Sequence, residues 1–372
     1  MTPTMTHPLS STPHADGFRM PGEFEPHSGC WMMWPERPDN WRLDAGPAQE
    51  AFAAVAEAIH PSDPVTMAVS RAQFSNARAR LSPGIRVVEI ASDDAWMRDI
   101  GPTFVIDAKG RRRAVDWRFN AWGGDFNGLY TPWDRDDAVA ARVAELEGVE
   151  HYRAPFVLEG GAIHVDGEGT AFTTEECLLS PGRNPGLSKA EIEDLLKDYL
   201  GVETVIWIPR GVHEDETTGH VDNLLHVCAP GLVALTWTED RDDPQAERSA
   251  EALALLETVR DARGRRLEIV KLPAPGPLYM SASEAAGIAA ATTGMARGGG
   301  QRLAASYANF YIGTGRVVFP LLDPATDGAA RHILQDLFPT REIIGVPGRE
   351  ILLGGGNIHC ITQQVPATPA PA

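Results

Sequence analysis

The chain has 372 residues, with 33 Lys and Arg against 51 Asp and Glu, so its formal net charge is −18. Its hydrophobic fraction of 43% and charged fraction of 23% are typical of a globular protein with an ample core. No apolar run approaches the roughly 20 residues that a membrane span needs. The acidic balance argues against binding to nucleic acid or to anionic membranes, and it favours a cationic partner or substrate.

Cysteine usage and the N-terminal sequence predict a cytoplasmic protein. The first 20 residues lack a basic segment followed by an apolar one, so we expect no secretory signal. The four cysteines are predicted to be free thiols in a reducing compartment: Cys30, Cys177, Cys228 and Cys360. No CxxC motif and no His/Cys spacing typical of zinc is present, so we predict neither a metal nor another cofactor.

Taken in chain order, the sequence predicts disordered ends around one catalytic domain. Residues 1–19 are polar and Pro-rich, and residues 367–372 resemble them, so both segments are expected to be disordered. Between them, residues 20–366 contain no convincing linker and are predicted to form a single domain. Helical patterns occupy 48–59, 134–147, 188–200, 245–260 and 330–337. The clearest begins with a Ser188/Glu191 capping box.

The strand patterns recur in a common form, namely a polar or Gly-bearing entry, a short apolar strand, a turn and a second strand. Five occurrences separated by helical segments predict a repeat architecture. The five occurrences are the segments RDIGPTFVIDAKGRRRAVDW, LEGGAIHVDGEGTAFTT, GHVDNLLHVCAPGLVALTW, SYANFYIGTGRVVFP and LGGGNIHCITQQVP. The last has no full return strand, so the apolar segment CWMMW at 30–34 is predicted to close a ring.

His220 and Asp222 are separated by one residue. On a strand, residues i and i+2 face the same side, so an imidazole and a carboxylate would project together. A polar strand end is the alternative reading of this pair.

A glycine run at 354–356 precedes Cys360 by a few residues. Glycines let the backbone approach a ligand closely. A buried structural thiol is the alternative, and it suits the other three cysteines, which lie in or beside apolar runs.

Two further segments place carboxylates where strands meet loops, at Asp99 and at Glu159, with Trp96 near the first. Turn chemistry alone would explain each of them. Together with Cys360 and His220, however, they match what the deimination of a guanidinium needs. The reaction requires a thiolate nucleophile, a proton donor for departing ammonia, and acids that hold the N–H groups.

The acidic run at 213–216 lacks the second histidine of an HExxH motif. It is either a solvated loop or a charged rim that faces a cationic end of the substrate.

Several segments resemble the signature segments of agmatine deiminases, which belong to the guanidine-modifying pentein superfamily. These are MPGEFEPHSGCWMMWPERPDNWR, DDAWMRDIGPTFV, FNAWGGDFNGLYTPWDRDD, LEGGAIHVDGEGT, EDETTGHVDN and GGGNIHCITQQVP. The resemblance runs from about residue 20 to 366. It implies an α/β-propeller with five ββαβ-type units around a pseudo-five-fold axis and a central active site. The implied reaction converts agmatine and water to N-carbamoylputrescine and ammonia, a step towards putrescine, in a homo-oligomer.

The resemblance also implies roles for individual residues. By motif, Cys360 matches the nucleophile, His220 the general acid/base, and Asp99 and Asp222 the carboxylates that hold the guanidinium. Glu159 matches a further acid beside the histidine. The implied substrate-binding residues are Trp96 along the methylene chain, Trp122, and one of Glu214, Asp215 or Glu216 at the distal ammonium.

Two other readings stay open. A bacterial peptidylarginine deiminase would share the Cys/His/Asp core, but it would use arginines to hold a substrate carboxylate. The segment AWGG at 121–124, where we would expect those arginines, is neutral. A non-catalytic pentein such as the ribosome anti-association factor is the second alternative, although the full set of Cys, His and acids argues against it.

Overall fold

The computed structural model describes residues 7–291 and 293–368. Their strands form five separate sheets, with the orders β1-β5-β6-β7, β10-β9-β8, β11-β12-β13, β14-β15-β16 and β17-β2-β3-β4. The strands are β1 (Phe18–Arg19), β2 (His27–Met33), β3 (Val65–Val69), β4 (Arg86–Glu89), β5 (Thr103–Asp107), β6 (Arg112–Arg118), β7 (His151–Val157), β8 (His164–Val165), β9 (Thr170–Thr174), β10 (Thr204–Ile208), β11 (Leu225–Ala229), β12 (Leu232–Trp237), β13 (Glu268–Pro273), β14 (Tyr311–Ile312), β15 (Arg316–Leu321), β16 (Glu342–Pro347) and β17 (Thr362–Pro366).

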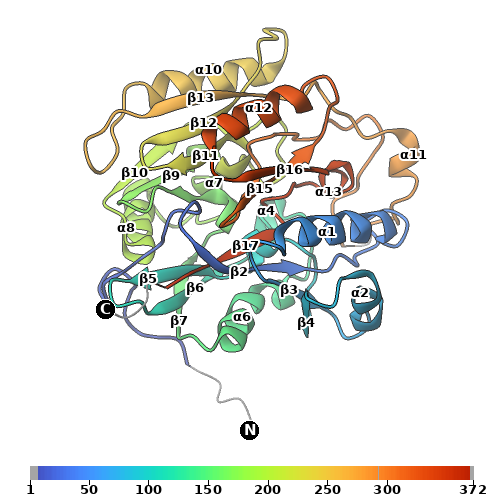
Figure 1. Ribbon diagram of the computed structural model, residues 1–372, viewed down its shortest axis with the longest axis horizontal. Coiled ribbons are helices and arrows are strands. Elements are labelled where there is room, and N and C mark those ends of the chain that lie inside the picture. Colours follow the sequence, from blue (N-terminus) through green and yellow to red (C-terminus); the bar gives the residue numbers. More distant parts are fainter. Residues whose placement is uncertain (1–6, 292, 369–372) are drawn as a thin grey trace.

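Helices connect and cover these sheets. They are α1 (Gly46–Ile59), α2 (Phe74–Arg80), α3 (Met97–Ile100), α4 (Gly124–Asn127), α5 (Asp134–Asp137), α6 (Val139–Glu147), the 3₁₀ turn η1 (Gly160–Ala162), α7 (Glu175–Leu178), α8 (Lys189–Leu200), α9 (Val221–Leu224), α10 (Pro244–Leu256), α11 (Ala282–Ala285), α12 (Asp327–Leu337) and α13 (Arg349–Leu353). In Figure 1, α8, α10, α2 and α6 lie at the margins of the view, around the strands.

Each sheet repeats one plan. An antiparallel pair is followed by a helical crossover and a third strand that runs parallel to the second, as in β11, β12, α10 and β13. The same order holds for β5-β6-β7, β8-β9-β10 and β14-β15-β16. The predicted five-unit α/β architecture is therefore confirmed.

The fifth unit is assembled from the two ends of the chain. Strand β17 pairs antiparallel with β2, with Gln364 opposite Cys30, and β2 then pairs parallel with β3. This is the ring closure predicted for the CWMMW segment. It places the loop that carries Cys360 beside elements from the N-terminal part of the chain.

The longer helices confirm the predicted patterns, with ends that shift by a few residues. Helix α8 has the predicted Ser188/Glu191 capping box and ends at Gly201 in a left-handed conformation. The predicted helix over 134–147 is two helices, because the chain turns at Ala138 between α5 and α6.

The expectation of disorder over residues 1–19 is wrong for residues 7–19. Leu9 packs against one hydrophobic cluster, and the backbone N–H of Leu9 donates to the carbonyl of His151. Phe18 is buried, and β1 pairs with β5. These apolar contacts outweigh the polar composition that suggested disorder. Residues 1–6 and 369–372 lie outside the described residues.

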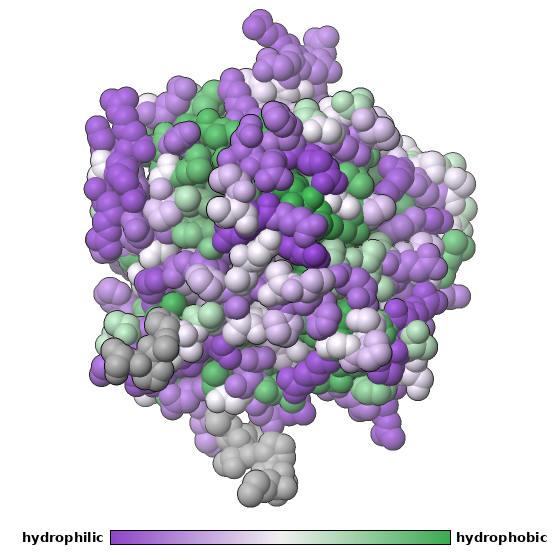
Figure 2. Space-filling model, in the orientation of Figure 1, coloured by the Kyte–Doolittle hydropathy of each residue, from purple (hydrophilic) through white to green (hydrophobic). Residues whose placement is uncertain are grey.

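The surface in Figure 2 is mostly hydrophilic, with separate small apolar areas. Among the described residues, no helix combines the length and the apolar character that crossing a membrane requires. The buried core is instead divided among several hydrophobic clusters, one of which includes Cys30, Trp96 and Cys360.

Candidate active site

Four loops and short helices bring the predicted core residues together. Cys360 lies between α13 and β17, Asp99 lies in α3, and Glu159 directly precedes η1. His220 and Asp222 lie at the start of α9. All five side chains are buried. The chain thus places a thiol, an imidazole and three carboxylates in one interior region.

The prediction that His220 and Asp222 share one face of a strand is wrong. Residues 221–224 form one helical turn, and strand β11 begins only at Leu225. All four residues of this turn are buried, so the alternation of buried and exposed side chains that is typical of a half-buried strand is absent here. The two side chains nevertheless reach the same site.

The Cys360 thiol contacts two oxygen atoms. Its Sγ lies 3.4 Å from Oδ1 of Asn309 and 3.8 Å from Oδ2 of Asp222. Oδ1 of Asn309 also accepts the backbone N–H groups of His359 and Cys360. Burial, together with the charges of Asp222 and Asp99, raises the pKa of Cys360 well above its usual value. The thiol is therefore protonated when no cation lies beside it.

The His220 ring faces two acids. Its Nε2 lies 3.3 Å from Oε2 of Glu159, and its Nδ1 lies 3.9 Å from Oδ1 of Asp99. Burial alone would lower the pKa of His220, but Asp99, followed by Cys177 and Glu159, raises it well above the usual value. Nδ1 has no hydrogen-bond partner within the described part of the chain, so a protonated ring has a free donor there.

The two aspartates are held differently. Asp99 accepts the backbone N–H of Gly161 and the indole N–H of Trp122, each at 2.9 Å, and burial raises the pKa of Asp99 to about 6. Asp222 binds Nδ1 of His359 at 2.8 Å through Oδ2. Burial would raise the pKa of Asp222, but His359 lowers it overall. Oδ1 of Asp222 has no hydrogen-bond partner among the described residues.

Glu159 is fixed by a buried arginine that the sequence reasoning missed. Nε of Arg183 donates to Oε1 of Glu159 at 2.8 Å, and both side chains are fully buried. Arg183 also donates to the carbonyls of Trp122 and Thr217. Burial opposes ionisation of Glu159, but Arg183 and then His220 bring the pKa of Glu159 below its usual value.

Two of these residues, Cys360 and Asp99, line a pocket. Asp222 and His220 lie behind them, in contact with Cys360 and Asp99 respectively, and do not line it. Trp96 and Trp122 line it, with their rings 6.5 Å apart at 79°. Trp96 is also packed against Trp41, and its indole N–H donates to Asp94 at 3.0 Å. The pocket therefore joins a polar end to rigid aromatic walls.

The acidic run contributes only one residue to this pocket. Glu216 lines it and is held by two hydrogen bonds of 2.6 Å from Arg297. Asp215 is turned away and bonds to Thr217 and Asn223. The side chain of Glu214 is about half exposed and lies beside His213. The structure does not bring Glu214 or Asp215 to the pocket.

Two arginines also line the pocket, although the segment where we expected such residues is neutral. Arg37 binds Asp39, with Nε 2.6 Å from Oδ1, and Arg297 binds Glu216. Arg37 and Arg297 lie far from residues 121–124 in the sequence, so the neutral composition of that segment did not indicate that arginines line the pocket. Each is already paired with an acid.

Two clusters among the described residues hold several side chains of the types that bind metals. One is Glu159, Cys177 and His220, and the other is Glu23, His164, His226 and His359. In the first, Arg183 and His220 already neutralise Glu159. In the second, both ring nitrogens of His359 lie 2.8 Å from carboxylate oxygens, and Arg98 lies beside Glu23. We assign neither as a metal site, because hydrogen bonds and ion pairs account for both.

Gly161 lies at the centre of the polar end, and Gly161→Ala is expected to lower kcat/KM about 100-fold or more and to lower the free energy of unfolding by about 1–3 kcal/mol. A Cβ at this position would lie 2.5 Å from Nδ1 of His220, 2.9 Å from Oδ1 of Asp99 and 3.0 Å from Oδ2 of Asp222. Steady-state kinetics and thermal unfolding measure the two effects. Gly186→Ala is the control, because nothing lies within 4 Å of its added Cβ. Unchanged kinetics in Gly161→Ala would contradict this geometry.

Comparison with known proteins identifies the relatives of this chain. Residues 19–366 match the family described as Porphyromonas-type peptidyl-arginine deiminase. The chain is 59% identical over 365 residues to the agmatine deiminase of Pseudomonas aeruginosa (strain LESB58), covering 98% of this chain and 99% of the relative. It is 57% identical over 361 residues to that of Ectopseudomonas mendocina, covering 96% and 98%. The solved agmatine deiminase of Enterococcus faecalis superposes with a TM-score of 0.95 at 49% identity, covering 97% of this chain and 99% of that one.

Proposed function

The chain belongs to the Porphyromonas-type peptidyl-arginine deiminase family and is a hydrolase of the C–N bonds of amidines, and from that premise we propose that its substrate is agmatine. The products would be N-carbamoylputrescine and ammonia, which places the reaction on a route to putrescine. One observation carries the proposal: Cys360 and Asp99 line a pocket with indole walls, and Asp222 and His220 lie directly behind them. A planar guanidinium would bind beside Cys360 and Asp99, and a methylene chain would run along the indole walls.

In the first step, the bound guanidinium lies between Asp99 and Asp222. Its positive charge next to Sγ offsets the two aspartates, lowers the pKa of Cys360, and lets the thiol proton leave to solvent. The thiolate then attacks the guanidinium carbon, giving a neutral tetrahedral adduct. Asp222 would receive N–H groups at its free Oδ1, and Asp99 would hold the opposite nitrogen.

In the second step, protonated His220 gives its Nδ1 proton to one NH₂ group, the C–N bond breaks, and ammonia leaves. An amidino-thioether on Cys360 remains, and the ring is now neutral. Water attacks this carbon while His220 takes a proton from it. The C–S bond then breaks, releasing the ureido product and the thiolate, and the remaining proton is carried away as ammonium.

At the distal end, Glu216 is the proposed acceptor of the substrate ammonium. It is the only member of the predicted trio Glu214, Asp215 and Glu216 that lines the pocket, within the part of the chain that the structure describes. Arg297 already binds both of its oxygens, so an ammonium would share this carboxylate or displace part of that pairing.

Peptidylarginine is the second candidate, because Arg37 and Arg297 are available in the pocket to meet a substrate carboxylate. Their pairing with Asp39 and Glu216 reduces that attraction. We expect kcat/KM for agmatine to exceed that for free arginine and for a peptide ending in arginine by about 100-fold. Equal or greater values for arginine or the peptide would overturn agmatine as the substrate.

Agmatine binding is expected to weaken as the pH falls below about 6, the pKa of Asp99. The guanidinium binds the carboxylate form, so below this pH a proton must leave Asp99 for each cation bound. The dissociation constant of the Cys360→Ala variant should therefore rise by up to about tenfold per pH unit. Calorimetry between pH 5 and 8 measures it. A constant value across this range would contradict the role of Asp99, and adding Asp99→Asn should remove the dependence.

The predicted homo-oligomer is a further part of the proposal. Sedimentation of the purified protein would test it, and a monomer at micromolar concentration would contradict it.

A further inference from the structure

Asp222 is the first of three buried, hydrogen-bonded groups, and the reaction steps above do not use the other two. His359 directly precedes Cys360 in the sequence. Its Nδ1 lies 2.8 Å from Oδ2 of Asp222, and its Nε2 lies 2.8 Å from Oε2 of Glu23. All three side chains are at least nine-tenths buried. The order is carboxylate, imidazole, carboxylate.

This geometry determines the charge of the ring. A neutral imidazole has one N–H donor and one lone pair, whereas a carboxylate only accepts. With both neighbours ionised, a neutral His359 would place a lone pair against a carboxylate oxygen at 2.8 Å. A doubly protonated ring instead donates to both oxygens, and such charge-assisted bonds are the strong ones in a buried site.

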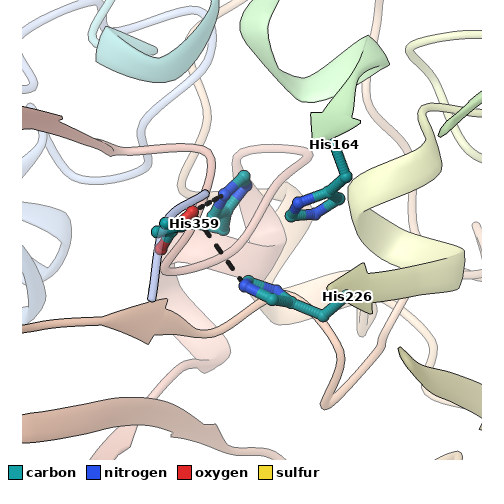
Figure 3. Close-up of side chains that lie close together, drawn as sticks. His164, His226 and His359 are labelled. Atoms are coloured by element: carbon teal, nitrogen blue, oxygen red, sulfur yellow. Dashed lines mark hydrogen bonds and ion pairs between the residues drawn. The ribbon is translucent and has the colours of Figure 1, made fainter. Parts of the chain in front are cut away.

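The neighbouring imidazoles are placed differently. Figure 3 shows His164, His226 and His359 turned towards one another from separate elements. Nδ1 of His226 lies 2.9 Å from the carbonyl of Ala308, so it carries the proton, and Nε2 of His226 lies 4.0 Å from Glu23. His164 is stacked on His359 with ring centroids 5.1 Å apart. Burial lowers the pKa of both, for His226 to about 4.

Arg98 completes the charge balance. Nη2 of Arg98 lies 3.6 Å from Oε2 of Glu23, and Nε of Arg98 donates to the carbonyl of His359 at 3.3 Å. The charged groups that face His359 are therefore Glu23, Asp222 and Arg98, with the Cys360 thiol next along the chain. Two carboxylates meet two cations, and the neutral rings of His164 and His226 fill the remaining space.

We propose that His359 is a positioning residue for the deimination: as an imidazolium anchored on Glu23, it keeps Asp222 ionised and holds its Oδ1 towards the substrate guanidinium. This inference rests on the proposed function. Burial and Arg98 lower the pKa of His359, but Glu23 and Asp222 raise it overall. Burial likewise opposes ionisation of Glu23, yet His359 and Arg98 bring the pKa of Glu23 well below its usual value. The three groups thus support one another's charges.

The kinetic test compares His359→Gln with His164→Gln. Without the imidazolium, burial raises the pKa of Asp222, so the acid limb of kcat/KM should move to higher pH. At pH 7 we expect kcat/KM to fall about 10- to 100-fold, as for the loss of one buried charge-assisted hydrogen bond. His164→Gln removes an equally buried ring without touching a carboxylate and should leave the acid limb in place. Glu23→Gln should also move the acid limb of kcat/KM to higher pH, but by a smaller shift than His359→Gln. An unmoved acid limb in folded His359→Gln would overturn the proposal.

A second measurement needs no substrate. In protein labelled with ¹⁵N-histidine, the signal that disappears in His359→Gln should report a doubly protonated ring from pH 6 to 9. A neutral ring at pH 7 would overturn the proposal, as would stoichiometric metal bound by this cluster in the purified protein. If the wild type does not act on agmatine, the proposed function fails, but this signal still decides the charge of His359.

Discussion

The Cys360→Ala variant is expected to lose turnover by about 10⁴-fold or more while it still binds agmatine. The thiol is the proposed nucleophile, and no other described thiol lines the pocket. The groups proposed to hold the guanidinium, Asp99 and Asp222, keep their own partners Gly161, Trp122 and His359. Calorimetry should therefore give an affinity close to that of the wild type for its substrate. Rates like those of the wild type would exclude Cys360 as the nucleophile.

The matched control is Cys228→Ala, which removes another buried thiol. Burial raises the pKa of Cys228 to about 12, and its Sγ lies 3.6 Å from the carbonyl of His226. This variant should keep its activity even if removing the buried sulfur lowers the free energy of unfolding. A haloacetamidine should alkylate Cys360 alone, and agmatine should protect it. Equal labelling of several cysteines, with no protection, would favour a protein that only binds.

The Asp99→Asn variant is expected to lower kcat/KM by about 100- to 1,000-fold, the effect of removing one charged partner of the transition state. The amide has no charge to offer the guanidinium, and the Trp122 and Gly161 N–H groups are left with a weaker acceptor. The loss of Asp99 also lowers the pKa of His220, because Asp99 is the largest of the influences that raise it. The basic limb of the pH profile should therefore move to lower pH. Steady-state kinetics from pH 5 to 10 measures both effects.

Asp116→Asn is the control for this change. Burial raises the pKa of Asp116 to about 6, as it does for Asp99, but Asp116 binds Arg153 away from the pocket. The substitution removes a similar buried carboxyl without touching the site. Comparable losses of kcat/KM in both variants, with the folded state intact, would mean that the effect of Asp99→Asn is not specific to the guanidinium.

The five-unit repeat architecture was predictable because each unit shows its own local sequence pattern. Each unit has short apolar strands, a turn and an amphipathic helix, and the capping box of α8 lies within a few residues of sequence. The ring closure was also accessible, since the last unit lacked a strand and the N-terminal apolar segment had no other partner. The helical turn at 221–224 was missed, because four residues are too few to display a helical period.

The groups that support the site were not predictable in the same way. Arg183, Asn309 and Glu23 are single polar residues in ordinary surroundings, and their contacts span 24, 51 and 336 positions along the chain. No spacing rule connects such pairs. One signal was available for Arg183: a buried Glu159 beside two glycines needs a cation, but the sequence does not say which one.

The acidic run at 213–216 is a second case in which the sequence alone does not show which side chain reaches the site. Glu214, Asp215 and Glu216 are equivalent as sequence, yet the left-handed conformation of Glu214 and the bonds from Asp215 to Thr217 and Asn223 direct only Glu216 to the pocket. Which of three neighbouring carboxylates reaches a site depends on the turn of the backbone, which composition does not determine.

The release of ammonia from agmatine by the purified wild type tests the central claim most directly. We expect ammonium and N-carbamoylputrescine in equal amounts, with the second product identified by its mass and with no release after Cys360 is alkylated. A folded protein with all four thiols reduced that releases neither product from agmatine would contradict it.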